Sequence, residues 1–136
     1  MAIGLTKTLP LDYDNLTPDG AENRRLIRTS SYSTTHYRLQ VGQILSAFRN
    51  RTLEEFWYFL SGRGEVWRSD GETAEITAVA SGVCMTIPIN TAFQIRCIGD
   101  EPLDLLGFYV PPWPADTVLE PVQGPWTNTP PPIRHP

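Results

Sequence analysis

A run of bulky residues constrains the fold of this chain more than any other stretch. Residues 56–60 (FWYFL) are all apolar or aromatic, Gly62 and Gly64 interrupt the run, and residues 65–67 (EVW) resume it. Aromatic residues favour strands, and glycines between two such runs are typical of a hairpin turn. We therefore expect two strands joined by a tight turn. The first should be covered on both faces, because its bulky residues do not alternate with polar ones.

The rest of the chain repeats the pattern of short strands and turns. Turn residues such as Gly42, Asp70-Gly71 and Pro88 separate short apolar or alternating segments, and no segment has a helical period. Further strands are expected at residues 24–29, 35–41, 44–48, 75–79, 83–87, 92–97 and 103–110. About nine short strands at such intervals predict an all-β sandwich or barrel.

Two motifs resemble those of the cupins. Glu55 and Gly62 match the glutamate and glycine that end the first cupin motif, and Gly82 and Pro88 match the start of the second. The segment 111–114 (PPWP) is similar to the end of the barrel in small bacterial cupins. The resemblance covers residues 24–114 and implies a cupin jelly-roll β-barrel (a double-stranded β-helix). It also implies a homodimer built by sheet packing, which would cover outward aromatics such as Phe56 and Tyr58.

The metal site that the resemblance implies is not matched. Cupins typically hold a divalent metal with three histidines and one glutamate, but the first histidine pair falls on Arg49 and Arg51, or on Phe48 and Asn50. The last histidine falls on Ala92 or Phe93. Arginine does not ligate metals, so we expect the metal-binding histidines to be replaced, and no metal or other cofactor.

The inner face of the barrel follows from strand alternation. If Glu55 points inward, Trp57 and Phe59 do too. The same parity places Arg49 and Arg51 inward, unless a bend near Thr52 reverses it. In the strand 92–97 either Phe93, Ile95 and Cys97 or the more polar Ala92, Gln94 and Arg96 face inward, and we favour the polar set. The predicted ligand-binding residues are Arg38, Arg49, Arg51, Trp57, Phe59, Phe93, Gln94 and Arg96.

Two residues are the candidates for acid–base chemistry. Glu55 has three interpretations: a salt-bridge partner of a nearby arginine, a general acid or base whose pKa is raised by aromatic neighbours, or a hydrogen-bonding group for a ligand. His36 is the histidine inside the expected barrel and would be its catalytic partner. A structural role remains the alternative for His36.

Composition excludes several classes of function. The net charge of −4 gives no basic surface for nucleic acid, and no apolar run is long enough to span a membrane. The N-terminus lacks the pattern of a signal peptide, so a cytoplasmic location is expected. The two cysteines, Cys84 and Cys97, predict buried thiols, or a pair facing each other across a hairpin in the second motif.

The chain divides into an arm at 1–23, a barrel at 24–114 and a tail at 115–136. Residues 111–136 hold nine of the 13 prolines, so they should form neither a helix nor a central strand. Trp113 and Trp126 should anchor the tail, with the residues from 127 onward loose.

Three functions are compatible with this sequence. The first is a metal-independent cupin that binds a small polar or anionic molecule, carboxylate-bearing or sugar-like, because arginine forks bind carboxylates. The second is a metal-independent isomerase, epimerase or lyase that uses Glu55 and His36, since the resemblance includes metal-free sugar epimerases. The third is a non-catalytic dimerisation scaffold.

Overall fold

Two facing antiparallel sheets form the protein. The structure is a computed structural model that describes residues 3–114 and 119–130. These residues contain strands and no helix, and so no helix that could cross a membrane. The strands are β1 (Asn15–Leu16), β2 (Glu22–Arg28), β3 (Ser33–Leu39), β4 (Phe48–Asn50), β5 (Glu54–Ser61), β6 (Arg63–Ser69), β7 (Ala74–Ala80), β8 (Cys84–Ile87), β9 (Ala92–Cys97), β10 (Leu103–Val110) and β11 (Leu119–Pro121).

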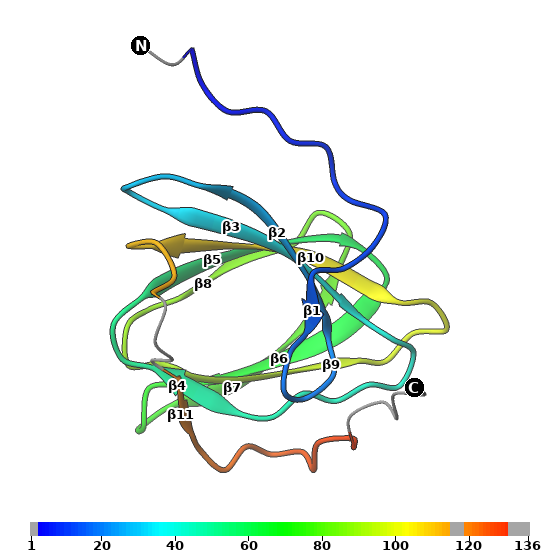
Figure 1. Ribbon diagram of the computed structural model, residues 1–136. Coiled ribbons are helices and arrows are strands. Elements are labelled where there is room, and N and C mark those ends of the chain that lie inside the picture. The colour runs from blue at the N-terminus through cyan, green and yellow to red at the C-terminus, as the bar shows by residue number, and fades with distance from the viewer. Residues whose placement is uncertain (1–2, 115–118, 131–136) are drawn as a thin grey trace.

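The strand order within each sheet is that of a jelly roll. One sheet has the order β1-β2-β3-β10-β5-β8 and the other the order β11-β4-β9-β6-β7. Figure 1 looks between them, with the first sheet above and the second below. The predicted all-β barrel is confirmed. The expected strand at 44–48 is wrong, because Ile44 makes only an isolated bridge to Arg96 and the strand begins at Phe48.

The two expected hairpins are also wrong. β5 lies in the first sheet and β6 in the second, so Gly62 marks a crossing between sheets and not a hairpin turn. In the same way β8 pairs with β5, whereas β9 pairs with β4 and β6. Cys84 and Cys97 are therefore free thiols that do not face each other, and Cys84 is exposed whereas the expectation was a buried residue. Glycines between two strands predict that the chain turns there, but they do not predict whether those two strands pair with each other.

Alternation along β5 divides its residues between the core and the surface. Trp57 and Phe59 join the core, whereas the outward Phe56 and Tyr58 are 41% and 39% exposed. The inward and outward sets are those predicted from parity. The expected cover on the outer face is not supplied by the part of the chain that the structure describes.

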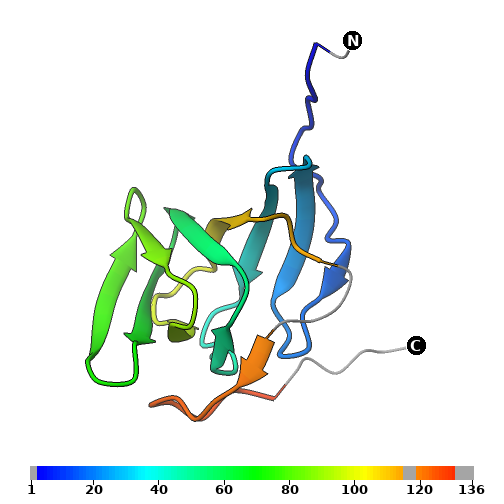
Figure 2. The same ribbon diagram turned by 90° about the vertical axis from the view of Figure 1, so that its left-hand side faces the viewer.

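The C-terminal segments are tied to the barrel. β11 forms the edge of the second sheet beside β4, as the prolines allow, and Figure 2 shows it at that edge. The backbone N–H of Trp113 donates to Ser33, and Trp126 exchanges hydrogen bonds with Gln94, so both tryptophans anchor their segments as expected. The expectation that the chain is loose from residue 127 is wrong at Thr129, whose backbone N–H donates to the Ile44 carbonyl. Residues 131–136 lie outside the described residues.

The N-terminal region joins the barrel earlier than the expected boundary at residue 24. β1 pairs with β2, and Ala21 is fully buried in the core. Before β1 the chain runs outward as an extended segment, which leaves the barrel in both views.

Replacement of Gly62 by alanine tests the crossing between the sheets. Gly62 has φ 83°, and an added Cβ would meet the Pro102 carbonyl oxygen and lie 2.8 Å from Leu103 Cα. We expect Gly62→Ala to lower the free energy of unfolding by at least about 2 kcal/mol in urea denaturation, because strain and steric overlap add. Gly71→Ala is the matched control, since Gly71 has φ 100° and nothing within 4 Å of its Cβ position. Equal losses for the two variants would contradict this account.

Candidate functional site

A buried carboxylate is the main polar feature of the barrel interior. Glu55, near the start of β5, is 3% exposed. The indole N–H of Trp57 donates to Oε1 at 3.0 Å, and the amide of Asn50 donates to Oε2 at 3.2 Å. Both donors are neutral, and Glu55 forms no ion pair among the described residues. The predicted salt bridge from a nearby arginine to Glu55 is therefore wrong.

Burial changes the ionisation of Glu55. Loss of solvation raises the pKa of the Glu55 carboxyl from its ordinary value of 4.5 to about 7, although the hydrogen bonds from Trp57 and Asn50 act in the opposite direction. A carboxyl with such a pKa exchanges its proton near neutral pH. The raised pKa is the one expected for Glu55 as a general acid or base, and that catalytic role stays a prediction.

Two tyrosines share the interior with Glu55. Tyr109 is the direct partner of Glu55 in the register of β10 and β5, and its hydroxyl lies 2.6 Å from that of Tyr37 on β3. Gly107 leaves room for the pair, because a Cβ there would lie 2.8 Å from the Tyr109 hydroxyl. Burial raises the pKa of both tyrosines, and the negative charge of Glu55 raises it further, although their mutual hydrogen bond lowers that of Tyr37. Both hydroxyls are therefore neutral. Tyr109 is buried and Tyr37 is half-buried.

Aromatic side chains surround this polar group. The Trp57 ring meets Phe93 edge-on at 5.4 Å and Phe59 at 6.4 Å between centroids. Trp113 packs edge-on against Tyr109 at 5.1 Å. Trp57 and Phe59 therefore lie on the inner face as predicted, and Phe93 joins them in the core.

Arg49 and Arg51 do not line this interior. Phe48 packs on the core opposite Phe93, so Arg49, next along β4, faces outward. Arg51 is exposed and pairs with Glu120 on β11. The Asn50 side chain accepts hydrogen bonds from the backbone N–H groups of Thr52 and Leu53 at 3.1 and 2.9 Å, which holds a bend before β5. This bend reverses the parity, so the prediction of inward arginines is wrong.

His36 and Arg38 lie on the outer face of the first sheet. Their neighbours Thr35, Tyr37 and Leu39 take the inner face of β3. The Arg38 guanidinium donates to both oxygens of Asp104 at 2.8 Å, and His36 Nε2 lies 3.1 Å from Asp104. Burial would raise the pKa of Asp104, but these partners hold it well below its usual range.

The prediction that His36 is the catalytic partner of Glu55 is therefore wrong. The two side chains project from opposite faces of one sheet, and His36 is 0% exposed. Arg38 is also no part of the barrel lining.

The polar residues of β9 likewise face outward. Phe93, Ile95 and Cys97 belong to the core, so the preference for the polar set was wrong. The Gln94 amide donates to the backbone carbonyls of Leu45 and Trp126 at 2.8 and 2.9 Å. The guanidinium of Arg96 lies 4.1 Å from the centroid of the Trp126 ring and pairs with Glu65. A tail that covers β9 allows polar residues on an outer face to be buried, which alternation alone does not reveal.

Sequence reasoning missed four residues near the interior. Asn50, Tyr37 and Tyr109 complete the polar group around Glu55. Alternation within residues 35–41 and 103–110 could have placed Tyr37 and Tyr109 on one face of their strands. The sequence could not show that these two strands lie near Glu55. Arg68 is the fourth residue and lies on the inner face of β6 with Val66. Its guanidinium donates hydrogen bonds to the Thr86 carbonyl and to Glu75, at the edges of the sheets.

The comparisons with known proteins agree with this architecture. Residues 35–109 match the family described as Cupin domain. The chain belongs to the cupin family. An uncharacterized protein of Methanocaldococcus jannaschii, MJ1618, is 31% identical over 116 residues, which are 79% of this cupin and 90% of the relative.

Solved structures show the same fold. BH2720 from Bacillus halodurans superposes with a TM-score of 0.62 at 24% identity, over 73% of this chain and 76% of its own. KdgF from Halomonas sp. gives a TM-score of 0.64 at 15% identity, over 74% and 87% of the two chains. At these identities the likeness concerns the fold alone.

The interior does not fit the metal that the cupin fold suggests. No three His, Cys, Asp or Glu side chains lie together within residues 3–114 and 119–130. The positions that would carry imidazoles on the inner face hold Phe48, Asn50 and Phe93 beside Glu55. One carboxylate with an amide and aromatic rings is a poor donor set for a divalent transition metal.

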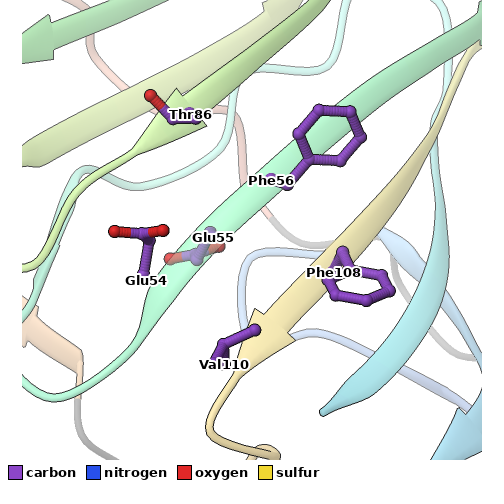
Figure 3. Close-up of a pocket in the computed structure, with 6 residues that line it drawn as sticks. All are labelled: Glu54, Glu55, Phe56, Thr86, Phe108 and Val110. Carbon is purple, nitrogen blue, oxygen red and sulfur yellow. The ribbon is translucent and has the colours of Figure 1, made fainter.

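An apolar groove lies on the outer face of the first sheet. It measures about 430 Å³ and is lined by Glu54, Glu55, Phe56, Thr86, Phe108 and Val110. Figure 3 shows the Glu54, Phe56 and Val110 side chains in front of the strands and Glu55 behind the ribbon of β5. The groove and the buried carboxylate are therefore separate features on opposite sides of one strand.

Substitution of Glu55 tests its ionisation. An acid whose pKa is higher in the folded than in the unfolded state binds a proton more tightly when folded, so stability falls as pH rises from 4.5 to about 7 and is level above that. We expect Glu55→Gln to remove this fall. The variant should gain about 3 kcal/mol relative to wild type between pH 4.5 and pH 8, measured by urea unfolding.

The neighbouring carboxylate supplies the control. Glu54→Gln, on the exposed face of the same strand, should leave the pH profile of stability unchanged. Parallel profiles for Glu55→Gln and wild type would show that Glu55 ionises normally.

Proposed function

We propose that this cupin binds a small, uncharged, hydroxyl-bearing molecule of the sugar or polyol type in the barrel interior, without a metal. The observation that carries the proposal is the Glu55 carboxylate, which is buried with neutral donors on both oxygens and forms no ion pair with any residue that the structure describes. A buried carboxyl that is not neutralised lowers stability, and such groups concentrate at functional sites. Tyr37 and Tyr109 add neutral hydroxyls, and Trp57 and Phe93 add rings of the kind that line small-molecule sites.

The charge of the interior decides the class of ligand. The arginines expected to bind an anion face outward, where Arg38, Arg51 and Arg96 pair with Asp104, Glu120 and Glu65. Arg68, on the inner face of β6, has its charge paired with Glu75. An anion beside Glu55 would meet like charge in a medium of low dielectric constant. The proposal therefore keeps the sugar-like ligand and drops the carboxylate-bearing one.

Acid–base catalysis at Glu55 is the second candidate. The pKa of the Glu55 carboxyl, about 7, suits proton transfer. Tyr109, on the adjacent strand β10, lies on the inner face with Glu55, whereas His36, the expected partner, lies on the outer face. Isomerisation or epimerisation of the bound molecule is the class of reaction that one such carboxyl and a neutral hydroxyl support. A cytoplasmic location is part of the proposal, since both cysteines are free thiols.

A panel of matched compounds tests the proposal. Neutral sugars and polyols, with the corresponding sugar acids, would be screened by thermal shift and native mass spectrometry at pH 8. Neutral members should bind at least about tenfold more tightly than their acids, which is about 1.4 kcal/mol. Tyr109→Phe should weaken binding by a similar factor, because one hydroxyl partner is lost.

Control variants separate the interior from the surface. Tyr32→Phe, which changes a tyrosine stacked on Phe108 on the outer face, and Arg96→Ala should leave affinity unchanged. Tighter binding of the acids, with loss on Arg96→Ala, would contradict the proposal. Chemical change of a bound neutral compound, abolished by Glu55→Gln, would favour the catalytic candidate, and no binding by any member would favour the scaffold.

A further inference from the structure

Asn23 on β2 carries a buried hydrogen-bond acceptor that has no partner. Its Oδ1 atom is shielded from solvent, and no donor within residues 3–114 and 119–130 reaches it. The interior Asn50 differs, because its amide donates to Glu55 and its Oδ1 accepts from two backbone N–H groups. An unpaired buried acceptor lowers stability, so its presence in a folded chain needs an explanation.

Asn23 shares the inner face of the first sheet with the polar group around Glu55. It is the direct partner of Tyr37 in the register of β2 and β3, and such partners project from the same face. The Tyr37 hydroxyl lies 2.6 Å from that of Tyr109, which is the direct partner of Glu55. These four residues, Asn23, Tyr37, Tyr109 and Glu55, form a polar stripe across the sheet.

The barrel has two sides on which the edges of the sheets come together. On one side Arg68 links them, because its guanidinium donates to the Thr86 carbonyl on β8 and to Glu75 on β7. The other ends of the two sheets, β1–β2 and β4–β11, therefore lie on the opposite side. Figure 2 shows β7 in green on the left and β2 in blue on the right.

The polar stripe is exposed to solvent at its β2 end. Glu55 and Tyr109 are each 3% exposed, whereas Asn23 and Tyr37 are half-buried. The facing sheet shows the same trend, since Phe48 on β4 and Leu119 on β11 are only partly buried. The interior therefore opens on the side of β2 and β11, with Asn23 at the opening and Glu55 at the closed end.

The wall that faces the polar stripe is apolar. Phe48 and Phe93 are direct partners on β4 and β9, and Leu119 packs against the same core. Sugar rings combine apolar C–H faces with hydroxyls at their edges, so they fit between one polar and one apolar wall. The shape of the chemistry thus extends from Glu55 to Asn23.

The charges near the opening already have partners. Arg25 lies two residues from Asn23 on β2, its side chain is 72% exposed, and its Nε lies 3.9 Å from the Asp14 carboxylate. The Asp19 carboxylate accepts from the backbone N–H of Ser46 at 2.9 Å. The neutral amide of Asn23 is therefore the group that selects a ligand here, and it selects a hydroxyl donor.

We infer that Asn23 is a second hydroxyl-binding point, and that the ligand is a chain of two or more linked sugar or polyol units. This inference rests on the proposed function. One unit binds at Glu55 and Tyr109, and the next donates a hydroxyl to Asn23 Oδ1. β3 and β10 separate β2 from β5, which is about 14 Å at the usual spacing of strands and more than a single sugar ring spans.

Single and linked sugars test the inference. Glucose, galactose, maltose, cellobiose and lactose would be titrated into the protein by calorimetry at pH 8. A disaccharide should bind the wild type at least about tenfold more tightly than its single units. Asn23→Leu, which removes the acceptor at similar size, should remove this gain, so that the disaccharide binds no more tightly than its units. Asn128→Leu, on the exposed tail, is the matched control and should keep the gain.

A measurement on the wild type complements the variants. In protein labelled with ¹³C at the asparagine side chains, the Asn23 carbonyl resonance should shift when the disaccharide is added and not when its single unit is added. Single units that bind without any gain for a disaccharide, a gain that survives Asn23→Leu, or an unmoved Asn23 resonance would overturn the inference and leave the proposed function standing. No binding of any neutral sugar to the wild type would overturn both.

Discussion

Face-to-face packing of two antiparallel sheets decides where each side chain of this cupin can act. The chain crosses from one sheet to the other at Gly62, and strict alternation then sends neighbouring residues to opposite environments. Glu55 enters the core while Glu54 and Phe56 face solvent. Because β3, β10 and β5 are adjacent, the same alternation gathers Tyr37 and Tyr109 at Glu55 and sends His36 to the other face.

The interior is chemically distinct from the metal centre that its fold suggests. Its polar group consists of one carboxyl, one amide, an indole N–H and two phenols, and cationic side chains pair with carboxylates elsewhere. Under the proposed function, such a group binds hydroxyls by donating and accepting hydrogen bonds and disfavours anions. Burial raises the pKa of the Glu55 carboxyl to about 7, whereas the hydrogen bonds from Trp57 and Asn50 act in the opposite direction.

Sequence patterns predicted the strands and the inner face of β5, because alternation is a local property. They did not predict which strands pair, because glycine turns look alike whether the chain reverses within a sheet or crosses to another. Each group of side chains that was predicted on the wrong face has a specific cause. A bend held by Asn50 reversed the parity of Arg49 and Arg51, and the tail at Trp126 covered an outer face so that Gln94 is buried there. His36 was misplaced because its neighbours on β3 take the inner face, so that His36 lies on the outer face beside Asp104.

The most direct test is titration of the Glu55 carboxyl by NMR, in protein labelled with ¹³C at the glutamate side-chain carboxyls and assigned with Glu55→Gln. The account predicts a midpoint near pH 7 in the metal-free protein, set by burial beside neutral donors. A midpoint at or below the ordinary value of 4.5 would contradict it, because a cation or open solvent would then have to stabilise the carboxylate.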